Sequence, residues 1–202
     1  MTHTWEILVL TKTLALCALL LPSLLAAQDT DIPEALLKGS KLVGGSASIS
    51  QQRTDDNKVT FISLNPELLA FVADGFAVGG RVGLSRQSSD GGSSTGWSIG
   101  PAMRAFFAAR DSRMLPYIGL SVLFGRTESK SFGTSATTTQ RVLDGALGIT
   151  RLLGDQVGLD AELFYTHTRF DRKFAPPIGG PSTTNFSTFG VRFGFSAFLL
   201  QR

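Results

Sequence analysis

His167 and its neighbours are the residues of this chain best suited to hydrolytic chemistry. Asp171 follows four positions later, and serines are abundant along the sequence. A serine, a histidine and an acid in contact can transfer an acyl group, because the histidine accepts the hydroxyl proton and the acid orients the ring. The same residue types are also common at polar surfaces. We therefore predict a polar rim position for His167, no catalytic residues and no enzymatic activity.

Metal and cofactor sites have little support in the residue types. The one cysteine, Cys17, lies within an apolar N-terminal run, and a metal site built on His167 with scattered carboxylates would be poorly specified. The glycine pairs at 44–45 and 79–80 do not lead into a helix, so they are not phosphate-binding loops. We predict no metal and no cofactor.

Seven charged residues form a second candidate group, whose chemistry would be ion pairing. Each alternates with apolar residues, on the same face as many glycines and serines. They are Glu67, Arg81, Arg104, Asp144, Asp160, Glu162 and Arg192. The role of these charges depends on whether the polar face of each strand points into the structure or toward its surroundings.

The N-terminal segment has the pattern of a removed signal peptide. Lys12 precedes an apolar run from 14 to 27, and the Ala26-Ala27-Gln28 junction offers a small residue for cleavage. A retained anchor is the alternative, but the run is shorter than the roughly 20 residues that a spanning helix needs. Removal of residues 1–27 would also remove Cys17 and leave His167 as the only histidine.

Composition limits the partners. The formal net charge is +3, and the charges are scattered rather than grouped, so we predict no nucleic-acid partner. Beyond residue 27 no apolar run approaches the length of a spanning helix. If the mature chain lies in a membrane, it must cross as strands.

Alternation of apolar and polar residues predicts eight β-strands. The clearest is the last, where Phe189, Val191, Phe193 and Phe195 alternate with glycine, arginine and serine. The expected strands span residues 41–53, 58–72, 76–87, 96–108, 115–126, 139–152, 157–168 and 188–197. Each has one apolar face.

The expected connections differ in length. Short ones fall at 73–75, 108–114 and 153–156, and longer polar ones fall at 52–57, 88–95, 127–138 and 169–184. Three short and four longer connections suit eight antiparallel strands of an outer-membrane barrel. On its outer wall an arginine at mid-depth would cost roughly 2 to 4 kcal/mol, so the seven charges should point inward or lie near a rim.

Several segments together resemble the small outer membrane protein β-barrel family common in the Bacteroidota. They begin at Lys41, Ile62, Phe76, Trp97, Leu115 and Phe189 and cover essentially the whole mature chain. The resemblance implies an all-β, closed, eight-stranded, porin-like transmembrane barrel in the outer membrane of a Gram-negative cell, with no shared enzymatic residues. We accordingly divide the chain into a signal peptide (1–27), a short periplasmic lead (28–40) and a barrel domain (41–202).

The last strand also carries a candidate assembly signal. Thr188, Gly190, Phe193 and Phe195 have a spacing that resembles the signal read by the outer-membrane barrel insertion machinery. We predict this machinery and outer-membrane lipid as partners of a monomer.

The favoured function is a structural or surface-interaction barrel, with the loops 88–95, 127–138 and 169–184 as contact surface. An eight-stranded interior is narrow, which favours an ion-paired plug over a channel. Three alternatives stay open: a small-solute porin, a soluble secreted barrel with its apolar faces turned inward around a ligand, and a lipid-modifying enzyme that uses His167.

Overall fold

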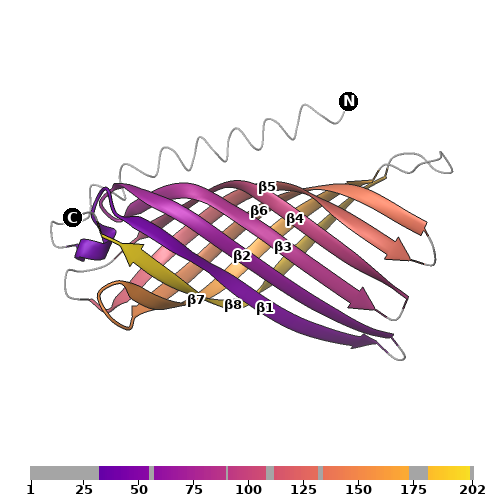
Figure 1. The fold of residues 1–202 in the computed structure, drawn as a ribbon, viewed down its shortest axis with the longest axis horizontal. Helices are drawn as coiled ribbons and strands as arrows, with labels where there is room; N and C mark the ends of the chain where they lie inside the picture. Colours follow the sequence, from indigo (N-terminus) through magenta and orange to yellow (C-terminus); the bar gives the residue numbers. More distant parts are fainter. Residues whose placement is uncertain are drawn as a thin grey trace. The chain divides into compact units, whose positions relative to one another are not determined.

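The segments with alternating apolar and polar residues form eight β-strands in the computed structural model. Each strand pairs with the next in an antiparallel ladder. The strands are β1 (Lys41–Thr54), β2 (Asn57–Ala73), β3 (Phe76–Ser89), β4 (Gly92–Phe106), β5 (Met114–Ser131), β6 (Thr134–Leu152), β7 (Val157–Arg172) and β8 (Ser182–Leu199). β8 returns to pair with β1, so the sheet closes into a barrel (Figure 1). The predicted fold class and all eight strands are confirmed.

The structure describes residues 32–54, 57–89, 91–107, 112–131, 134–172 and 182–200. The predicted signal peptide and residues 28–31 lie outside the described residues. We call the end where β1 begins and β8 ends the lead end, and the opposite end, where β1 is joined to β2, the hairpin end.

Three of the four longer connections expected at the hairpin end, 52–57, 88–95 and 127–138, are wrong, whereas the fourth, at 169–184, keeps nine residues between β7 and β8. β5 and β6 remain paired as far as Ser131 and Thr134, and β3 and β4 as far as Ser89 and Gly92. Only two residues separate the strands there, whereas seven lie between Phe106 and Met114 at the lead end. The Ser- and Thr-rich segments lack an apolar face, but strand pairing uses backbone groups, so the ladder continues beyond the apolar alternation.

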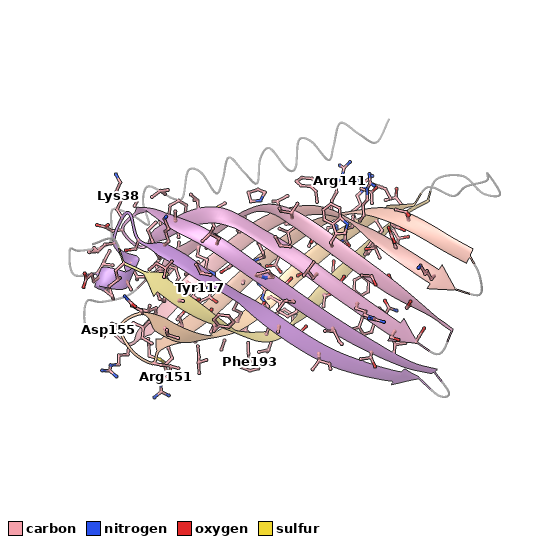
Figure 2. The ribbon with its side chains drawn as sticks, viewed as in Figure 1. Lys38, Tyr117, Arg141, Arg151, Asp155 and Phe193 are labelled. Carbon is pink, nitrogen blue, oxygen red and sulfur yellow. The ribbon has the colours of Figure 1, made fainter. Side chains whose placement is uncertain are left out.

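The outward face of the barrel carries the apolar side chains. Phe189 and Phe193 on β8 are 73% and 67% exposed, and every other strand contributes similar residues. Figure 2 shows Phe193 projecting from the outer surface. A soluble barrel around an apolar ligand would have the opposite arrangement, so that alternative is wrong.

The closure between β1 and β8 covers only part of their length. Their pairing runs from Lys41 with Leu199 to Ala47 with Phe193. Beyond those residues, toward the hairpin end, β1 pairs only with β2 and β8 only with β7.

Residues 32–40 close the interior at the lead end. They contain a 3₁₀ turn, η1 (Glu34–Leu36), whose Leu36 is fully buried. The Gly75 amide, in the β2–β3 turn, donates to the Leu36 carbonyl at 2.8 Å, and the Gly39 amide donates to the Phe71 carbonyl at 2.9 Å. The described part of the predicted lead is therefore a packed part of the barrel. Among the described residues, no helix has the length and apolar character needed to cross a bilayer.

Candidate functional site

All seven charged residues singled out in the sequence lie inside the barrel. Their side chains come from β2, β3, β4, β6, β7 and β8 and are only 0–8% exposed. Strand register places two pairs face to face, Glu67 beside Arg81 and Glu162 beside Arg192. The other contacts cross the barrel interior.

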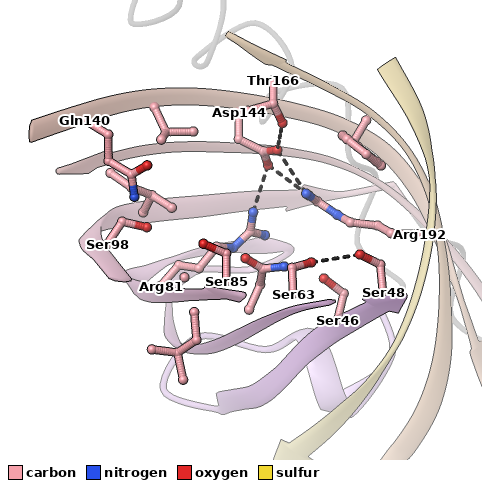
Figure 3. Close-up of a pocket in the computed structure, with 16 residues that line it drawn as sticks. Ser46, Ser48, Ser63, Arg81, Ser85, Ser98, Gln140, Asp144, Thr166 and Arg192 are labelled. Carbon is pink, nitrogen blue, oxygen red and sulfur yellow. Dashed lines mark hydrogen bonds and ion pairs between the residues drawn. The ribbon is translucent and has the colours of Figure 1, made fainter. Parts of the chain in front are cut away.

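Asp144 is the centre of the layer nearer the hairpin end. Arg81 Nη1 lies 2.8 Å from Asp144 Oδ1, and Arg192 donates to both carboxylate oxygens at 2.8 and 2.9 Å. The Thr166 hydroxyl donates to Asp144 at 2.7 Å. Figure 3 shows these donors converging on the one carboxylate. Arg81 also donates to Glu67 Oε2, at 2.7 and 3.0 Å.

Arg104 is the centre of the layer nearer the lead end. Its Nη2 lies 2.5 Å from Glu67 Oε1 and 3.1 Å from Glu162 Oε1, and its Nη1 lies 3.5 Å from Asp160 Oδ2. The guanidinium carbon lies 4.4 Å from the centre of the Tyr117 ring. Arg104 contacts both Glu67 and Glu162. Glu67 also contacts Arg81, and Glu162 also contacts Arg192, so the two layers form one network.

Hydroxyl groups complete the network, which has three guanidinium groups and four carboxylates. Tyr117 donates to Glu162 at 2.5 Å, and Thr150 and Ser196 each donate to Asp160 at 2.6 Å. Burying a charge is costly unless it is paired and its remaining sites are hydrogen-bonded. Asp160, whose contact with Arg104 is the longest of these ion pairs at 3.5 Å, has both oxygens hydrogen-bonded to hydroxyl groups, whereas the buried Arg104 Nε has no hydrogen-bond partner among the described residues.

An apolar layer lies between the charge network and the lead end, and the sequence analysis missed it. Phe71, Phe106, Tyr117 and Phe198 form it, with ring centres 5.2–6.4 Å apart between contacting rings. Leu36 packs into the same cluster. The available signal was the strand phase: Phe71 precedes the outward Val72, so it belongs to the inward face.

A cavity of about 210 Å³ lies on the hairpin side of the charge network. Serines line much of its wall, and Arg81, Asp144 and Arg192 contribute to it from the network. The lining serines are Ser46, Ser48, Ser63, Ser85 and Ser98. Leu84, Leu123, Val142 and Phe164 also line it, so the cavity wall is mixed, with polar and apolar parts.

His167 lies on the outward face of β7. Its Nδ1 is 3.0 Å from Ser187 Oγ on β8, and the Tyr165 hydroxyl is 3.1 Å from the same oxygen. Asp171 instead accepts hydrogen bonds from Arg169 and Thr183. A serine and the histidine thus meet, while Asp171 contacts Arg169 and Thr183 instead of the histidine.

The four residues of the candidate assembly signal lie on β8 with alternating orientation. Phe193 and Phe195 project outward and are 67% and 58% exposed. Thr188 and Gly190 belong to the other phase. Gly190 provides space for the Phe164 ring, because a Cβ there would lie 3.1 Å from two ring carbons.

The described residues contain no group of three or more histidine, cysteine or acidic side chains placed to hold a metal ion.

Comparisons with known proteins agree with the fold. The family model described as outer membrane protein beta-barrel domain matches residues 14–196. The crystal structure of Neisserial surface protein A is 16% identical with a TM-score of 0.52, over 78% of this chain and 94% of that one. The crystal structure of OprG from Pseudomonas aeruginosa is 14% identical with a TM-score of 0.56, over 84% of this chain and 100% of that one. Comparison with curated proteins finds no match.

Proposed function

Since this chain belongs to the outer membrane protein beta-barrel domain family and is an outer-membrane barrel, we propose that it is a plugged, non-enzymatic scaffold. Its interior serves to hold the wall together, and its hairpin end is presented to the cell exterior for contact with other molecules.

The observation that carries this proposal is the mutual pairing of the interior charges. A transport path needs groups that can release their contacts to a passing solute. Here Asp144 contacts two guanidinium groups at 2.8–2.9 Å, and Arg104 faces three carboxylates. The aromatic layer and Leu36 add a second barrier at the lead end.

Conductance in a planar bilayer tests the plug. Detergent-extracted protein, shown to be folded by heat-modifiable migration, should give no steady conductance under conditions where a large porin gives clear steps. Steady ion-conducting steps from the folded protein would overturn the proposal and favour the small-solute porin, for which the serine-lined cavity would be the entrance.

The absence of enzymatic activity is part of the same proposal. Among the described residues, the contact between His167 and Ser187 is the arrangement that comes nearest to acyl-transfer chemistry, and it lies on the outer surface of the wall. Envelope lipid acylation should be the same in cells with the native protein and with His167→Ala. A loss of one acylated or deacylated species in the variant would make the chain a lipid-modifying enzyme.

We also propose that the chain is a monomer whose β8 is read by the barrel insertion machinery. Phe193→Ser with Phe195→Ser should slow membrane insertion in cells more than Phe189→Ser with Val191→Ser. All four side chains project outward and are more than half exposed, so the two variants remove comparable apolar surface. Equal rates would reject the signal.

A further inference from the structure

Three arginines lie close together on the outer wall, on neighbouring strands near the hairpin end. Arg141 on β6 is directly opposite Arg169 on β7. Arg126 on β5 is opposite Thr139, two positions along β6 from Arg141 on the same face. Like charges directly opposite each other on adjacent strands are destabilising, so this arrangement needs a physical reason.

The acidic groups on this part of the wall do not balance the basic ones. On the outward face of β5, β6 and β7 near the hairpin end, the described charged side chains are Arg126, Glu128, Lys130, Arg141, Arg169 and Asp171. Asp171 lies 3.4 Å from Arg169 Nε and also interacts electrostatically with Arg141. The patch is therefore net positive.

The arginines begin where the apolar outer wall ends. Along β5 the outward series runs from Val122 and Phe124 to Arg126, and along β6 Leu143 is followed on the same face by Arg141. Phe124 is 52% exposed, as expected of a side chain that faces lipid. Figure 2 shows Arg141 projecting from the outer surface. In outer-membrane barrels the edge of the outward apolar band lies at the depth of the lipid headgroups.

From this juxtaposition we propose that Arg126, Arg141 and Arg169 bind a phosphate group on the headgroup of an outer-leaflet lipid. A guanidinium group matches phosphate oxygens with two parallel hydrogen bonds, and a shared anion would relieve the repulsion between the three cations. The neighbouring Phe124 and Leu143 would contact the acyl chains. The longest connection of the barrel, nine residues between β7 and β8, is at the hairpin end, and outer-membrane barrels carry their longer loops on the cell exterior, which selects the outer leaflet.

The test is a binding titration in zwitterionic detergent with two probes, a phosphorylated glucosamine lipid and the same lipid after removal of its phosphates. The native protein should bind the phosphorylated lipid more tightly. A triple variant, Arg126→Gln, Arg141→Gln and Arg169→Gln, should lose that affinity by roughly tenfold or more, because charge-assisted hydrogen bonds are lost. Its heat-modifiable migration should be unchanged.

The matched control removes three basic side chains at the lead end, with Lys41→Gln, Arg113→Gln and Arg151→Gln, all exposed in the structure. Its dissociation constant for the phosphorylated lipid should be within about twofold of that of the native protein, which corresponds to about 0.4 kcal/mol of binding free energy. Equal loss in both variants, native affinity in the first variant, or equal binding of the two lipids would overturn the proposal. Displacement of the lipid by inorganic phosphate at equal concentration would also overturn it, since the site would then be one for free phosphate.

Discussion

Two groups of three arginines in this barrel have opposite surroundings. Arg81, Arg104 and Arg192 lie inside and share four carboxylates, and their side chains are at most 8% exposed. Arg126, Arg141 and Arg169 lie outside, at the edge of the apolar wall. The face of a strand, which changes with every residue, therefore decides whether an arginine holds the barrel together or contacts its surroundings.

The energetic difference follows from solvent. A buried charge that loses its partner has no water to replace it, so removing one member of a buried pair costs about 3 to 5 kcal/mol. An exposed charge is solvated and screened by salt, and its contribution to folding is typically below about 1 kcal/mol.

The largest effect is expected for Arg104→Met. This change leaves Glu67, Asp160 and Glu162 buried without their shared cation, so unfolding should become easier by about 3 to 5 kcal/mol. Urea unfolding followed by the fluorescence of Trp97 measures it. Arg126→Met, outside, is the matched control. If the free energy of unfolding of Arg104→Met lay within about 0.5 kcal/mol of the native value, the interior and exterior arginines would not differ in their contribution to stability.

A smaller loss is expected for Glu162→Gln. The amide keeps the shape and can still accept from the Tyr117 hydroxyl, but the charge facing Arg104 and Arg192 is gone. We expect a loss of roughly 1.5 to 3 kcal/mol in the same assay. The double variant with Arg104→Met should lose less stability than the sum of the two single-variant losses, because the residues share contacts. Full additivity would show that they act separately.

Gly148→Ala tests how tightly the network is positioned. Tyr117 lies over Gly148, and a Cβ there would lie 2.3 Å from the Tyr117 ring, so the ring must move away from Arg104 and Glu162. We expect a loss of roughly 1 to 3 kcal/mol. Gly145→Ala on the same strand is the control, because its nearest atom would be 4.0 Å away. Similar losses in both variants would indicate a general effect of glycine in β6.

The smallest effect on stability is expected outside. Each single variant Arg126→Gln, Arg141→Gln or Arg169→Gln should change the free energy of unfolding by no more than about 0.5 kcal/mol in detergent without phosphorylated lipid. Arg141→Gln should be neutral or slightly stabilising, since it removes one of two like charges placed opposite each other. A loss comparable to that of Arg104→Met would contradict the comparison.

Local alternation was enough to predict the strands and their faces, including the inward orientation of Glu67 and Arg192. It could not predict where a strand stops at the hairpin end, because Thr134 and Ser131 pair through their backbones without any apolar pattern. It also missed the aromatic layer, since the period of two gives the face of Phe71 but not its depth along the barrel.

The amino-acid sequence by itself determined an eight-stranded barrel with an apolar outer wall and charges inside, because the side-chain period of a strand is a local property. Only the tertiary structure decided which charges meet. Arg104 and Asp160 are 56 residues apart and approach each other only because six other strands set the closure and register of the wall. The same closure turned residues 32–40 into a seal and placed Arg126, Arg141 and Arg169 side by side.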